Sequence, residues 1–290
     1  MGIASKAKLR GVMVVALVLA ARSSKANAAT ETDQTENPPP SFLTLDRMDE
    51  ASRFGIQVGF DKIDRVGLSD GFITRAEIYG QYVFPESLGG VYLHVPFGHY
   101  FNFDGSDHTS MGNVDLGGFI LPTHGSDLIL RVGLVLPTAS DDDARVVTNV
   151  IGGYERLTDL LLVPNDHATI RVSASTLQER GALFFRGDFG FDLVMDKPSS
   201  AGDAPSVYVR ANLAGGVHVD PVDLTLELVN WGALNGDVSG GIENRFLHTL
   251  AAGLSTRGTD QFRLGTVFPL DKEVRGEIWI VSLGYQHATN

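Results

Sequence analysis

The chain contains no cysteine, and this absence excludes several kinds of chemistry at once. Without a thiol there is no disulfide, no thiolate nucleophile, no cysteine-ligated metal site and no lipoprotein anchor. Basic residues are also scarce, because 23 Lys and Arg stand against 35 Asp and Glu, giving a formal net charge of −12. Nucleic-acid binding needs clustered Lys and Arg for the phosphates, so no nucleic-acid partner is expected.

Long apolar runs are lacking too, and none reaches the length that a transmembrane helix requires. The N-terminus carries a basic start, a short apolar run at 11–21 and the small-x-small pattern Ala26-Asn27-Ala28. These features are typical of a secretory signal peptide, which we predict at 1–28, although an uncleaved anchor shares them. An exported chain of this kind belongs in the periplasm, the outer membrane or the medium.

The motifs of common enzyme classes are absent as well. The sequence has no GxSxG elbow, HExxH helix, P-loop or GxGxxG fingerprint. Its eight histidines are scattered, and no serine clearly pairs with His248 to make a nucleophile and base. We therefore predict no catalytic residues, no metal site and no cofactor.

What the chain does have is strict alternation of apolar and polar residues. The stretch 112–138 reads as two strands joined by a tight turn, and in the second strand Leu130, Val132 and Leu134 share one face while Arg131 lies on the other. Successive strand side chains point to opposite faces, so one face here is apolar and the other is mixed. Such strands suit a wall between lipid and a polar interior, although a soluble sandwich uses the same alternation.

The alternation recurs along the chain and predicts about twelve strands, each near the length that crosses a bilayer at a tilt. The links after odd-numbered strands are mostly long and those after even-numbered strands are short, as in bacterial outer-membrane barrels. We therefore predict an all-β fold, an antiparallel up-and-down transmembrane β-barrel over 51–287. Its strands are expected at 53–63, 71–84, 90–101, 112–121, 127–137, 168–176, 181–194, 206–217, 221–231, 245–256, 261–270 and 274–286.

Two segments outside these strands carry their own predictions. The stretch 29–50 is acidic and contains three consecutive prolines, so it reads as a disordered linker, and its last part is either a short helix or a lead-in to the first strand. In the longest link, apolar residues from Val147 to Leu161 recur every three or four positions, and Pro164 ends the pattern. This spacing predicts a short helix, which could fold inward and narrow the pore or pack on the rim.

The polar face of each strand must point inward, because an Arg that faces lipid at mid-membrane costs roughly 2–4 kcal/mol. Two interpretations of this face stay open. It is a structural ion-pair network that fills a narrow barrel, or a permeation path that binds a small anionic or aromatic solute, and Arg suits paired contact with carboxylates in either case. The predicted lumen-lining residues are Arg75, Glu77, Tyr79, Tyr92, His94, Asp115, Arg131, Arg171, Arg186, Asp188, Asp192, Tyr208, Arg210, Asp223, Glu227 and Arg263.

The expected partners follow from the barrel prediction. Outward aromatic residues near strand ends, such as Phe54, Phe84 and Phe262, fit the interface girdles of a membrane barrel. We expect contact with outer-membrane lipid and lipopolysaccharide, recognition by the barrel assembly machinery, and a monomeric state. Barrels of this class commonly end on an aromatic residue, whereas the last aromatic residue here, Tyr285, is followed by a short tail.

Several short motifs resemble one known family. Gly112–Gly118 (GNVDLGG) and Leu134–Thr138 (LVLPT) are similar to motifs of the outer-membrane proteins grouped as the phenol-degradation MetA-pathway family. His248–Leu250 and the closing Ser282–Tyr285 also look similar. The resemblance spans most of the mature chain and implies a twelve-stranded type of barrel for uptake or export of small compounds, hydrophobic ones included.

Two positions depart from the family pattern: Asn113 stands where Asp is frequent, and Ala139 where Gly is frequent. The family brings no catalytic residues. Our first hypothesis is a barrel in the outer membrane of a Gram-negative bacterium that passes small solutes without catalysis. The alternatives are a structural or interaction barrel with a closed, ion-paired lumen, and a soluble periplasmic β-protein.

Overall fold

The fold is a closed antiparallel β-barrel. It was obtained as a computed structural model that describes residues 39–45, 51–63, 71–85, 88–102, 107–122, 127–139, 153–162, 167–195, 206–234, 246–272 and 274–289. The predicted signal peptide and most of the predicted linker lie outside the described residues. The strands all belong to one compact unit, Pro38–Asn290.

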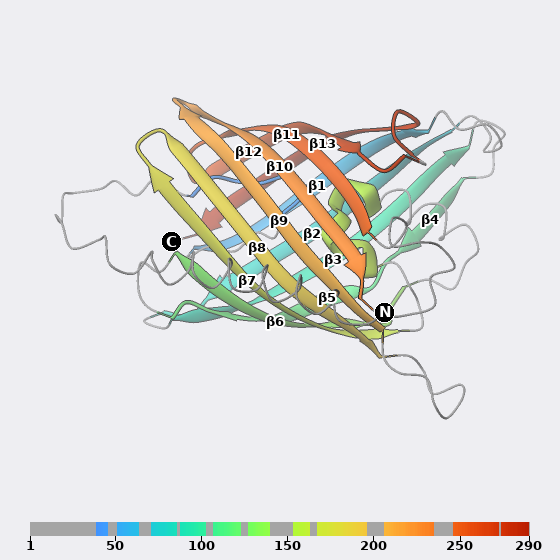
Figure 1. The fold of residues 1–290 in the computed structure, drawn as a ribbon, viewed down its shortest axis with the longest axis horizontal. Coiled ribbons are helices and arrows are strands. Elements are labelled where there is room, and N and C mark those ends of the chain that lie inside the picture. Colours follow the sequence, from blue (N-terminus) through green and yellow to red (C-terminus); the bar gives the residue numbers. More distant parts are fainter. Residues whose placement is uncertain are drawn as a thin grey trace, which may run out of the picture. The chain divides into compact units, whose positions relative to one another are not determined.

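Each strand pairs antiparallel with its neighbours, and the pairing of the first strand with the last closes the ring (Figure 1). The first strand pairs with the last, from Ser52 opposite Thr289 to Ile63 opposite Ile278, and β2 pairs with β3. The strands are β1 (Ser52–Ile63), β2 (Gly71–Val83), β3 (Gly89–Asn102), β4 (His108–Met111), β5 (Val114–Ile120), β6 (Leu128–Leu136), β7 (Ala168–Arg180), β8 (Leu183–Met195), β9 (Ser206–Val219), β10 (Val222–Ala233), β11 (Phe246–Thr256), β12 (Asp260–Pro269) and β13 (Ile278–Thr289).

The barrel has twelve wall positions because β4 and β5 share one of them. Both segments pair with β3, and the ladder is interrupted between them at Gly112 and Asn113. The amide of Asn113 donates inward to the carbonyl of Leu162 rather than to a wall strand. The predicted twelve-stranded antiparallel barrel is therefore confirmed, with short links at the end where both termini of the wall lie.

Several strand boundaries differ from the prediction, and β7 continues to Arg180 where its end was expected at 176. The segment β4 was expected to be part of a long link, since its sequence HTSM has no apolar alternation. The last strand begins at Ile278 rather than 274, because residues 274–277 form a turn in which Gly276 has a positive φ of 83°. It then continues to Thr289, so the expected tail after Tyr285 is paired with the start of β1.

The two faces of the wall have opposite chemistry. In β1 the outward residues Phe54 and Ile56 are 54% and 41% exposed, whereas the inward residue Gln57 is 1% exposed. In β6 the outward Val132 is 58% exposed and the inward Arg131 is 2% exposed. Apolar-out and polar-in is the reverse of a water-soluble core, and it suits a wall that stands in lipid.

Helical structure is sparse in the described residues. A 3₁₀ helix, η1 (Gly153–Leu162), lies in the longest link, between β6 and β7. No helix in the described ranges is long and apolar enough to cross a bilayer. The predicted helix in this link is confirmed in its second half, and residues 140–152 lie outside the described residues.

The outward apolar face yields a stability test. Replacing Val132, which lies at the centre of β6, with Arg should destabilise the refolded barrel in lipid by about 2–4 kcal/mol, because the charge would sit near the bilayer midplane. Val219→Arg at the short-link end of β9 should cost only about 0–1 kcal/mol. Equilibrium urea unfolding in lipid vesicles measures both, and equal small effects would contradict a membrane-embedded wall.

Candidate functional site

The interior of the barrel is the candidate site, and the predicted lumen-lining residues all point into it. Fourteen of the sixteen are buried, and Asp188 and Tyr208 are half-buried. Sequence reasoning missed further inward polar residues, among them Arg53, Gln57 and Asp61 in β1. The same alternation that identified the others could have found these three.

The helix η1 lies within the lumen, because its polar side chains contact inward residues of several wall strands. Glu155 Oε1 accepts hydrogen bonds from Gln57 Nε2 at 2.8 Å and from Ser282 Oγ at 2.7 Å, which come from β1 and β13. Gly59 makes room for this carboxylate, since a side chain there would overlap it. Of the two positions expected for the helix, inside the pore or on the rim, the structure has the first.

A second set of contacts joins η1 to the opposite part of the wall. The Arg171 Nη2 group of β7 donates to the Thr158 carbonyl at 2.6 Å. Within η1, Asp159 accepts a hydrogen bond from Arg156 Nε at 2.5 Å. Burial alone would raise the pKa of the Asp159 carboxyl, but the nearby guanidinium groups, Arg156 first among them, outweigh burial and hold that pKa below its ordinary value.

The segment Pro39–Leu45 also lies in the lumen. Glu227 Oε1 accepts the Leu43 amide at 2.7 Å, and its Oε2 accepts the amide and hydroxyl of Thr44 at 2.8 and 2.6 Å. The Leu43 side chain packs into a hollow that exists because Gly265 has no side chain. Seven residues of the predicted 29–50 linker are thus placed, and within them Phe42 to Leu45 are buried and hydrogen-bonded instead of solvated.

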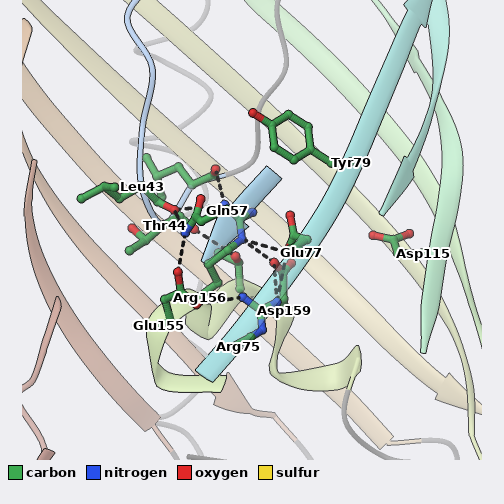
Figure 2. Close-up of polar contacts among 12 residues, drawn as sticks. Leu43, Thr44, Gln57, Arg75, Glu77, Tyr79, Asp115, Glu155, Arg156 and Asp159 are labelled. Atoms are coloured by element: carbon green, nitrogen blue, oxygen red, sulfur yellow. Dashed lines mark hydrogen bonds and ion pairs between the residues drawn. The ribbon is translucent and has the colours of Figure 1, made fainter. Parts of the chain in front are cut away.

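These two segments contact each other at the centre of the barrel (Figure 2). Arg156 Nη1 donates to the carbonyls of Leu43 and Leu45 at 3.1 and 3.3 Å, and Thr158 Oγ1 donates to the Thr44 carbonyl at 3.1 Å. We call Pro39–Leu45 and η1 together the plug. The plug places backbone and charged groups from two distant parts of the sequence inside the lumen.

The wall around the plug carries its own chain of ion pairs. The Asp115 carboxylate forms ion pairs with Arg171 at 2.7 Å and with Arg131 at 3.1 Å. Arg171 also forms an ion pair with Asp192 at 3.2 Å, and Arg210 binds the Asp192 carboxylate at 2.9 Å. Guanidinium and carboxylate groups thus pair across five strands, β5 to β9, as the pairing geometry of Arg favours.

Other inward groups pair locally. Arg186 donates to Asp188 at 3.0 Å, and His218 Nδ1 lies 2.6 Å from Asp223 Oδ1. Arg263 donates to the Phe42 carbonyl at 2.9 Å and to the Tyr79 hydroxyl at 2.8 Å. The described residues include no cluster of three or more His, Asp or Glu side chains that could hold a metal ion.

Two tyrosines of the predicted lining, Tyr208 and Tyr92, have their rings in contact with other inward side chains. The Tyr208 and Trp231 rings stack with centroids 4.6 Å apart, both inside the barrel. Arg131 lies 3.6 Å above the centroid of the Tyr92 ring. Outside the lumen, His248 Nδ1 lies 2.9 Å from Asp271, so this histidine is held by an acid rather than by a serine.

Neither a protein-family model nor a curated protein matches the chain. Solved structures similar to it include the NanC porin, with 10% identity and TM-score 0.48, covering 82% of this chain and 99% of that one. The translocator domain of the autotransporter NalP from Neisseria meningitidis is 12% identical, with TM-score 0.45 and coverage of 98% and 97%.

A monoaromatic hydrocarbon channel, CymD, is 9% identical, with TM-score 0.41 and coverage of 84% and 90%. At such low identities the likeness concerns the fold alone. The comparison with family models gives no support to the resemblance with the phenol-degradation MetA-pathway family.

The anchor of the N-terminal part of the plug can be tested by Glu227→Gln. The amide has one acceptor oxygen and no charge, so it cannot replace hydrogen bonds to an ionised group, each of which contributes about 1.5–3 kcal/mol. Amide hydrogen exchange in the peptide that contains 39–45 should accelerate by roughly tenfold or more.

Asp223→Asn is the matched control for this test. It removes a buried charge from the same strand, but Asp223 contacts His218 and not the plug. Equal exchange rates at 39–45 in the two variants would show that Glu227 does not hold this segment.

Proposed function

We propose that the chain is a monomeric outer-membrane channel for small solutes, without catalysis, whose lumen the plug closes at rest. Outer-membrane lipid and lipopolysaccharide surround the apolar outer face, and the barrel assembly machinery inserts it through a final strand that carries Tyr285. The path is lined by paired Arg and carboxylate groups. Such a lining lets small polar or aromatic solutes bind briefly without leaving a bare charge in the wall.

One observation carries this proposal. The nitrogen–oxygen distances of the closest ion pairs within the wall and within the plug are short, whereas those of the ion pairs between the plug and the wall are longer. Within the wall, Arg75 binds Glu77 at 3.0 Å and Arg171 binds Asp115 at 2.7 Å. Within the plug, Arg156 binds Asp159 at 2.5 Å.

Across the boundary, the same groups are farther apart. Arg156 lies 3.4 Å from Glu77, and Asp159 lies 3.6 Å from Arg75 and 3.5 Å from Arg171. Arg75 is also 3.7 Å from Glu155.

This division matters because an unpaired buried charge is very costly, and removing one member of a buried pair destabilises by about 3–5 kcal/mol. If η1 moved away, Arg75 and Arg171 of the wall would keep their closest carboxylates, and Arg156 would keep Asp159. The groups that lose partners are chiefly amides, hydroxyls and carbonyls, which water in the opened lumen can satisfy. The helix η1 can thus leave while Arg75 and Arg171 of the wall keep their closest charged partners.

A permanently closed structural barrel is the second candidate. The observation that favours it is the number of hydrogen bonds that hold the plug, including three donors on Glu227 alone. In that case no condition would open the lumen short of unfolding. Electrical conductance separates the two candidates.

The test is conductance of the refolded mature chain, 29–290, in planar lipid bilayers. We expect rare, brief openings from the intact chain and steady conductance from a variant that lacks 143–163, because that deletion removes η1. A matched control deletes 197–204 from another long link and should behave like the intact chain. Silence of the 143–163 deletion, despite a folded barrel with heat-modifiable gel mobility, would rule out the channel.

A further inference from the structure

Asp61 is an anomaly in an interior where charges are otherwise matched. Its side chain is fully buried, and neither carboxylate oxygen has a hydrogen-bond partner. Every other buried Asp or Glu in the described ranges has a hydrogen bond or an ion pair. An isolated buried carboxylate is among the most costly groups a protein can hold, so this one calls for a partner.

The surroundings of Asp61 are apolar on both sides. Its cross-strand neighbours are Ile73 on β2 and Ile280 on β13, both buried. Ile280 belongs to a cluster of inward apolar residues with Ile278, Val267 and Ala251. Among the described residues, Asp61 is therefore an acid without a hydrogen-bond partner beside an inward apolar cluster.

The plug covers this region. Tyr154 of η1 packs against the same apolar cluster. The next residue, Glu155, lies over Gly59 and interacts repulsively with Asp61, and the cation that attracts Asp61 is Arg75. Arg75 is already engaged by Glu77. The closed state thus places a second acid near Asp61 and supplies no cation of its own.

We propose that Asp61 is the recognition point for an organic ammonium, a primary amine carried on a small apolar or aromatic body. The ammonium binds the Asp61 carboxylate, and the apolar body takes the place of Tyr154 on the apolar cluster. A bare metal ion fits less well, because it needs several oxygen ligands and the cross-strand neighbours of Asp61 are isoleucines. This inference rests on the proposed function, since the ligand reaches Asp61 when η1 moves away.

A ligand that binds only the opened state must shift the plug equilibrium toward opening. The full mature chain can therefore be tested without any deletion. Phenethylamine is the probe, and amide hydrogen exchange of the peptide containing 153–162 is the readout. We expect saturating phenethylamine to accelerate this exchange at least about fivefold. The neutral analogue phenylethanol and the anionic analogue phenylpropionate have a similar body and should have no such effect.

The substitution Asp61→Asn should abolish the response to phenethylamine while keeping the shape of the side chain. Asp260→Asn is the control, because Asp260 is an exposed acid at the start of β12 that binds His287, and it should respond like the parent. Asp61→Leu provides a second variant with an apolar side chain in case the Asn variant does not refold.

The outcomes are decisive for Asp61. An equal response to phenethylamine and phenylethanol, or an unchanged response in both Asp61 variants, overturns the proposal and means that Asp61 has only a structural role. The readout does not depend on ion flow. A response to phenethylamine in a chain that never conducts would uphold the ammonium site and refute the channel, whereas conductance without this response would do the reverse.

Discussion

The structure depends on one constraint: charges that a closed wall forces into a narrow interior must find partners there. An antiparallel barrel sends alternate side chains inward from every strand, and lipid outside leaves the polar ones no other place. In water these groups would be solvated, but within the lumen only another side chain, a backbone group or a trapped water can replace that solvation. The chain of contacts from Asp115 through Arg171 to Asp192 is the direct result.

The same constraint shapes the plug. A segment that enters such a lumen must bring groups that complement the wall, and an apolar segment would strand the wall's polar atoms. Pro39–Leu45 offers backbone amides to Glu227 and backbone carbonyls to Gln57 and Arg263. The helix η1 adds its own internally paired charges. Glycines at 59 and 265 provide the space, because even one methyl group at either position would collide with the plug.

Much of this architecture could be predicted from the sequence, because strand alternation is a local property. The twelve wall positions, the face of each inward residue and the helix in the longest link all follow from spacing over a few residues. The strand β4 could not be found this way, since it is short and has no apolar alternation. The last strand, β13, extends to Thr289 because it pairs with β1 up to Ser52, and this long-range pairing is not visible in local spacing.

The plug's N-terminal part escaped prediction for a different reason. Its composition, three prolines beside acidic and polar residues, is that of a solvated linker. Burial of Phe42 and Leu43 arises only from partners such as Glu227, which is 184 residues away from Leu43 in sequence. The pairing of particular arginines with particular carboxylates was equally hidden, because alternation reveals which face a residue occupies but not which residue stands opposite across the lumen.

The two parts of the plug reach the centre from opposite ends of the barrel, and this has a consequence for control. Pro39 and Pro40 line a small pocket with Asp127 and Leu177 at the end of the barrel that has the short links. The helix η1 belongs to a link at the opposite end. They meet where Arg156 binds the carbonyls of Leu43 and Leu45. Release of either segment removes the hydrogen bonds that Arg156 and Thr158 donate to the other, so the two segments stabilise each other reciprocally. Under the proposed function, a ligand acting at one end of the lumen and a pull on the N-terminal segment at the other would therefore favour the same open state.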